Sequence, residues 1–145
     1  MTARWTSAPV AGSLYFLVVF AAGFALGVPR TLLIAPAIGE LAAVLMEVPV
    51  MLWIAWVACG WTLSRIEVLP EPAQRVMVGA SALVLLLSAE AALSVYLSGR
   101  TLLEHFLSYT RPSQLIGLAG QLAYAGFPLV RRINAAGSRP SSTSR

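Results

Sequence analysis

The chain has 145 residues, of which 58% are hydrophobic and 11% charged, and its mean hydropathy is +0.78. This composition excludes an ordinary soluble domain, because too few polar residues remain to cover its surface. The net charge of +4 comes from arginine and glutamate alone, without lysine or aspartate, which is typical of a GC-rich bacterial genome. Such a charge suits anionic lipid headgroups better than nucleic acid. We therefore expect an all-α polytopic membrane protein of one domain, with the lipid bilayer as a partner and no nucleic acid.

Four apolar segments are long enough, or nearly so, to cross a bilayer as helices, which takes about 20 residues. The first is expected to be a retained helix and not a cleaved signal peptide, because the next apolar segment follows within a few residues. We place the boundary between the first two at Pro29, since proline disfavours helix in the residue before it. Pro49 is expected to kink the long second span. The predicted spans are 12–28, 32–60, 76–98 and 112–130.

A short amphipathic helix is predicted between the third and fourth spans, followed after the fourth by a tail. Leucine and phenylalanine recur from Leu102 to Leu107 at helical spacing, which is typical of a helix lying in the membrane interface. The tail, 131–145, is basic and rich in serine and is predicted to be disordered and cytoplasmic. Seven arginines would lie on the side of the two termini and three on the other side. This asymmetry favours cytoplasmic N- and C-termini in an inner membrane.

Three polar side chains are predicted at one depth in the bundle. Counted at 1.5 Å per residue from the outward ends of their spans, Glu40 and Glu90 lie about 12 Å deep and Gln121 about 13–14 Å deep. Membrane carboxyls normally face the bundle interior and find partners there. Arg30 and Arg100 are the nearest cations on the outward side and are the expected partners of Glu40 and Glu90.

Glu47 differs from the other membrane carboxyls, because no partner is expected for it. It lies two helical turns beyond Glu40 on the same face, beside Pro49 and near the middle of the membrane. Together these side chains predict a polar cleft that opens outward and narrows towards Glu47. The predicted cleft, or ion and substrate pathway, consists of Glu40, Glu47, Glu90, Gln121, Tyr124, Arg30, Arg100 and His105.

Gly23 and Gly27 form a GxxxG motif on the first span. Such a motif permits close backbone approach between helices, although it also arises by chance in a span rich in glycine and alanine. With four spans and this motif, a homo-oligomer or a complex with another membrane protein is expected.

Three interpretations of the polar groups stay open. In the favoured one they fix the packing of the helices in a structural or accessory subunit of a membrane complex. In the second, the cleft belongs to a small transporter or channel for a cation or a proton-coupled solute, and Glu47 changes its protonation state. A membrane-embedded enzyme is the third. It is disfavoured because the sequence has no nucleophile constellation, no nucleotide motif and no Glu-x-x-His pair. No catalytic residue, metal site or cofactor is predicted.

Overall fold

The computed structural model describes the backbone of residues 7–137 and the side chains of residues 7–131. Within this range the chain is all-helical and contains no strand. In chain order the elements are α1 (Ser7–Pro29), the π-helical η2 (Arg30–Ile34), α2 (Ala35–Ile38), α3 (Glu40–Arg65), α4 (Pro72–Ser98), α5 (Leu102–Ser108) and α6 (Pro112–Gly137).

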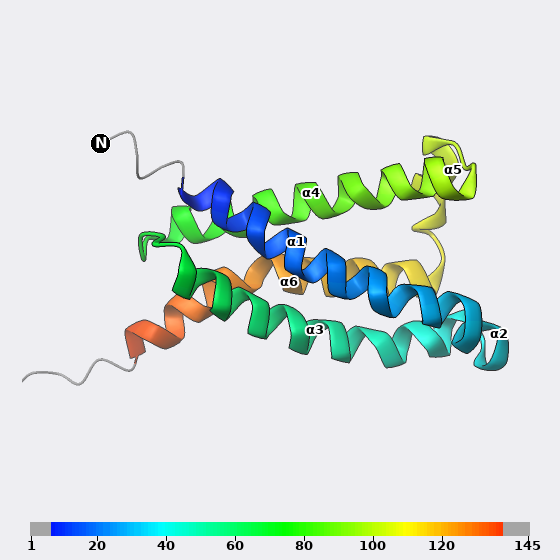
Figure 1. Ribbon diagram of the computed structural model, residues 1–145, viewed down its shortest axis with the longest axis horizontal. Helices are drawn as coiled ribbons and strands as arrows, with labels where there is room; N and C mark the ends of the chain where they lie inside the picture. Colours follow the sequence, from blue (N-terminus) through cyan, green and yellow to red (C-terminus); the bar gives the residue numbers. More distant parts are fainter. Residues whose placement is uncertain (1–6, 138–145) are drawn as a thin grey trace, which may run out of the picture.

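The four long helices α1, α3, α4 and α6 run side by side along the length of the molecule (Figure 1). α1 contacts α3 and α4, and α6 contacts the same two helices, so the four helices surround a common interior. The start of α1 and the end of α6 lie at one end of this bundle, whereas α2 and α5 lie at the other end (Figure 1).

Among the described residues, three helical stretches are long and apolar enough to cross a membrane: Ser7–Ile38, Glu40–Arg65 and Pro72–Ser98. The first stretch contains the predicted span 12–28 and the third contains 76–98, whereas the predicted span 32–60 is divided between the first and second stretches. The fourth predicted span lies in α6, which is of comparable length but is not among the three.

The first reversal of the chain lies at Gly39, and the predicted boundary at Pro29 is wrong. The helical path continues through Pro29 into the π-helical η2, which directly follows it. Gly39 has a φ of 90°, a backbone conformation that glycine adopts without steric cost. The predicted spans 12–28 and 32–60 are therefore replaced by helical stretches that meet at Gly39.

α3 is one helix that contains Pro49, and the kink predicted there stays a prediction. The remaining departure concerns the tail. α6 extends to Gly137, so its last residues are helical where a disordered tail was predicted to begin, and 138–145 lie outside the described residues.

α6 is held against α3 by Arg131, whose Nη2 donates a hydrogen bond of 2.6 Å to the carbonyl of Trp56. Its guanidinium also lies over the Trp56 ring at 4.3 Å, a favourable cation–π geometry.

A tight core fills the half of the bundle away from α2 and α5. The ring of Tyr15 stacks on that of Tyr124 at 4.4 Å, and its hydroxyl donates a hydrogen bond of 3.0 Å to the Tyr124 carbonyl. Glycine permits the closest helix contact, since a Cβ on Gly79 would overlap the carbonyl oxygen of Ala125. The buried apolar members of this core are Tyr15, Val19, Ala55, Ala58, Cys59, Ala82 and Tyr124.

Candidate functional site

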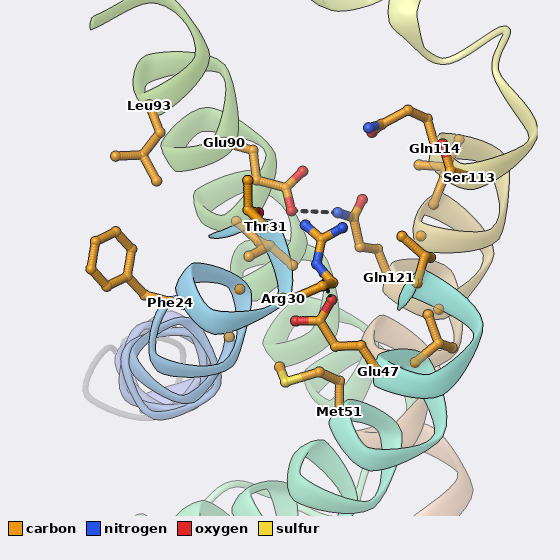
Figure 2. A pocket seen from close by; sticks show the side chains of 18 of the residues that line it. Phe24, Arg30, Thr31, Glu47, Met51, Glu90, Leu93, Ser113, Gln114 and Gln121 are labelled. Atoms are coloured by element: carbon orange, nitrogen blue, oxygen red, sulfur yellow. Dashed lines mark hydrogen bonds and ion pairs between the residues drawn. The ribbon is translucent and has the colours of Figure 1, made fainter. Parts of the chain in front are cut away.

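A cavity of about 820 Å³ occupies the other half of the bundle, between α1, α3, α4 and α6 (Figure 2). It begins near the turns that carry Arg100 and Ser113 and ends on the core at Ala55 and Tyr124. Apolar side chains such as Phe20 form much of its wall. Its volume and its mixture of apolar and polar lining residues are typical of small-molecule binding sites in proteins.

Arg30 and Glu47 form an ion pair inside the cavity, with 2.6 Å between Nε and Oε2 (Figure 2). Their side chains are 25% and 19% exposed. The Nε–H group of Arg30 is not aligned for a hydrogen bond to this carboxylate, so the contact is an attraction between opposite charges at short range. The expectation that Glu47 has no partner is therefore wrong. The shifted reversal explains the pairing, since Arg30 and Glu47 lie at similar distances in sequence on either side of Gly39.

Glu40 lies at the mouth of the bundle and not about 12 Å inside it. It is the first residue of α3 and is exposed. Its carboxylate accepts a hydrogen bond of 2.9 Å from the hydroxyl of Ser113, in the first turn of α6. The expected pairing with Arg30 is consequently wrong. Glu47, two helical turns further along α3, takes the depth that was predicted for Glu40.

Glu90 accepts a hydrogen bond of 2.6 Å from the side-chain amide of Gln121 (Figure 2). The phenol of Tyr109, which follows α5, also lies near Glu90. Burial raises the pKa of the Tyr109 phenol above its usual value, and the nearby charge of Glu90 raises it further. Both of these neighbours of Glu90 are thus neutral. Arg100, the expected cation, is instead exposed on the turn between α4 and α5 and lines the mouth.

His105, Tyr124 and the two glycines of the GxxxG motif also line the cavity. His105 is buried, with its ring against those of Phe106 and Tyr109 at 5.7 and 5.4 Å. A Cβ on Gly23 would meet only the end of a methionine side chain, and one on Gly27 only a Glu47 oxygen at 4.0 Å. Within the described chain, these glycines widen the cavity and make no close backbone contact.

Several polar residues that line the cavity were not among those predicted, and Ser113 and Tyr109 are the two that lie beside predicted carboxyl groups. Ser113 could have been found, because it shares the i, i+4, i+8 face of α6 with Gly117 and Gln121. Tyr109 carried no such signal, since its position depends on the turn that ends α5.

The fold and the cavity define a class of protein: in its described residues, an all-helical chain with three helices apolar enough to cross a membrane and a cavity of mixed apolar and polar lining. Among the described residues no three histidine, cysteine or acidic side chains gather as in a metal site. Comparisons with models of known families, with curated proteins and with solved structures found no match.

Proposed function

We propose that this protein is a four-span integral membrane protein that binds a small solute in its cavity and moves it across the bilayer with a proton. The observation that carries this proposal is the pairing of Arg30 with Glu47 and of Glu90 with Gln121 around an open cavity. Ionisable groups at this depth are costly, and in membrane proteins they mark ion, proton and substrate pathways.

The empty volume beside these pairs favours a binding role. Polar pairs that only fix helix packing gain most when neighbouring side chains exclude water around them. Here the ion pair borders a cavity of about 820 Å³, and Glu90 borders the same cavity. Figure 2 shows Arg30, Glu47, Glu90 and Gln121 converging on it from different helices. A solute in the cavity would therefore contact all four.

Protonation of Glu47 would release Arg30, and this change couples proton binding to the shape of the site. A neutral Glu47 no longer attracts the guanidinium, so Arg30 becomes available to other acceptors around the cavity. Passage also requires the floor to open, where Tyr15 and Tyr124 close the bundle. Rearrangement of helices around a central site is the usual route for small transporters.

The topology that we propose has α6 as a fourth span and both termini in the cytoplasm of a bacterial inner membrane. The arginine asymmetry supports this orientation. α5 then lies in the outer interface, because it turns His105 and Ser108 into the bundle and exposes its leucines and Phe106.

Reconstitution into proteoliposomes tests this function. The purified chain is given an imposed proton gradient, and uptake of a panel of small cationic, anionic and neutral solutes is followed together with the internal pH. We expect proton-linked uptake of at least one solute, lost in Glu90→Gln and Glu47→Gln. Glu40→Gln is the matched control, because Glu40 is exposed at the mouth and does not line the cavity.

A structural or accessory subunit is the second candidate. The observation in its favour is that each polar pair joins two different elements, η2 with α3 and α4 with α6, which fixes the register of the bundle. The partner would be a second copy or another membrane protein. Mild detergent extraction should then yield a larger complex that Glu90→Gln loosens. A monodisperse single chain with wild-type uptake would contradict this candidate.

A further inference from the structure

We infer that the solute is an organic monocation, a protonated amine with an apolar body, whose ammonium group is held by Glu90 and Gln121. This inference rests on the proposed function and names the class of molecule that the same cavity takes. It follows from the charges, the acceptors and the apolar walls of the cavity.

Carboxylates outnumber guanidinium groups in the inner part of the cavity. Arg30 is engaged by Glu47 at 2.6 Å. Glu90 accepts a hydrogen bond from Gln121 and lies near the phenol of Tyr109, and both of these groups are neutral. A carboxylate removed from water needs a cation or a proton to balance it, and neutral donors do not supply that charge. The Glu90 position is therefore the one that attracts a positive group.

Other charged groups face the cavity only nearer its mouth. Arg100 is exposed there and His105 is buried in α5. Glu104 points to the start of its own helix, where it accepts a hydrogen bond of 2.8 Å from the backbone of Thr101. Water and salt screen the exposed groups strongly. The charge that a bound solute meets at depth is thus set by Arg30, Glu47 and Glu90.

Gln121 adds a second acceptor beside the Glu90 carboxylate. Its amide nitrogen donates to Glu90, and its carbonyl oxygen Oε1 is buried without a hydrogen-bond donor. An ammonium group carries three N–H donors and can satisfy both oxygens at once. A quaternary ammonium ion has the positive charge but no N–H donors. A neutral alcohol has an O–H donor but no charge.

The wall of the cavity suits an apolar, preferably aromatic, body. Phe20 and Phe24 line it with ring centroids 6.5 Å apart, and Leu86 and Leu93 line it from α4. Figure 2 places Phe24 and Leu93 on the same side of the cavity. Phenylalanine rings also attract cations that approach their faces.

An anionic solute fits this arrangement poorly. It would have to take Arg30 from Glu47, which would leave two carboxylates, Glu47 and Glu90, without a cation in the same cavity. Leaving one member of a buried ion pair without its partner is strongly unfavourable. The ion pair therefore disfavours anions while Glu90 favours cations.

The test measures equilibrium binding to the full-length protein in detergent by titration calorimetry, with three probes of nearly equal shape. The probes are phenethylammonium, phenethyl alcohol and phenylacetate. At about pH 8 we expect phenethylammonium to bind at least about tenfold more tightly than the other two, as a charged hydrogen bond predicts. Its affinity should fall as the pH is lowered to about 5, because protons compete for the same carboxylate.

Glu90→Gln should weaken phenethylammonium binding by about tenfold or more, while Glu40→Gln, at the mouth, should bind as the wild type does. Should Glu90→Gln not elute as a monodisperse species, Gln121→Leu replaces it and is expected to weaken binding several-fold. Equal binding of the alcohol, or tighter binding of phenylacetate, would overturn the cation class while leaving solute binding by the cavity intact. Failure of all three probes to bind would overturn the inference, and the uptake panel then decides separately whether the proposed function also fails.

Discussion

Arg30 and Glu47 are the residues on which the interior of this molecule most depends. Removing either one leaves a charged, mostly buried side chain without its partner in the cavity. We expect Arg30→Gln and Glu47→Gln each to destabilise the protein by about 1–3 kcal/mol. The double variant should lose less than the sum, with a coupling of about 1–2 kcal/mol. Reversible unfolding in mixed micelles measures the free energy of unfolding of the two single variants and of the double variant.

One further variant controls this double-mutant cycle. Glu40→Gln should change stability by less than about 0.5 kcal/mol, because Glu40 is exposed and bonded to a serine hydroxyl. A coupling near zero between Arg30→Gln and Glu47→Gln would show that the two side chains do not act as a pair.

The depth of each polar residue could be predicted from the sequence only where the helix ends were placed correctly. Glu90 and Gln121 were placed at one depth by counting from Ser98 and Pro112, and α4 and α6 do end and begin there. The structure accordingly joins their side chains. Glu40 was placed too deep, because its span was counted from the wrong reversal.

At the scale of the elements, the decisive difference lies between Pro29 and Gly39. A proline disfavours helix in the residue before it and so favours a boundary there, but the chain continues past Pro29 into the π-helical η2. The chain reverses its direction at Gly39 instead, where the glycine adopts a positive φ. The identity of the residues did not distinguish these outcomes. In the resulting hairpin, α1 packs against α4 and α3 packs against α6.

The contact between α4 and α6 depends on Gly79. A methyl group at this position would overlap the carbonyl oxygen of Ala125, which cannot move without shifting α6. We expect Gly79→Ala to destabilise the bundle by about 1–3 kcal/mol, despite the better helix propensity of alanine. Thermal unfolding in detergent reports this loss. Gly126→Ala is the matched control, since an added Cβ there meets nothing within 4 Å. Equal melting temperatures for the two variants would contradict the packing.

α5 is held at its start by a capping box between Thr101 and Glu104. Hydrogen bonds from Thr101, chiefly from its backbone N–H, hold the pKa of the Glu104 carboxyl below its usual range. A lowered folded-state pKa means that this stabilisation is complete above the unfolded value of about 4.3 and is lost as the pH falls through the folded one. Hydrogen exchange in nanodiscs should show α5 amides less protected in Glu104→Gln than in wild type at about pH 6.

The difference between these two proteins should vanish at about pH 3, where Glu104 is protonated in the wild type as well. Thr101→Ala should lose protection at both pH values, because it removes the side-chain acceptor of the cap. Equal α5 protection of wild type and Glu104→Gln at about pH 6 would show that the box does not hold the helix.

At the scale of the whole molecule, the proposed topology places the α3–α4 turn in the cytoplasm and α5 outside. In a Cys59→Ser background, an impermeant maleimide should label Thr110→Cys in intact cells. It should label Ala73→Cys and Ser141→Cys only after permeabilisation. Labelling of Ser141→Cys from outside would mean that α6 does not cross the membrane. Labelling of Ala73→Cys from outside would mean that the orientation is reversed.

The central claim is that Glu90 and Glu47 handle a solute and a proton inside the bundle. The most direct measurement is proton-linked uptake of phenethylammonium into proteoliposomes at about pH 5–8, with wild type, Glu90→Gln, Glu47→Gln and Glu40→Gln compared at equal reconstituted amounts. We predict uptake that depends on pH in wild type and Glu40→Gln and is reduced at least about tenfold in the other two. Wild-type uptake across this pH range by folded Glu90→Gln and Glu47→Gln would contradict the account.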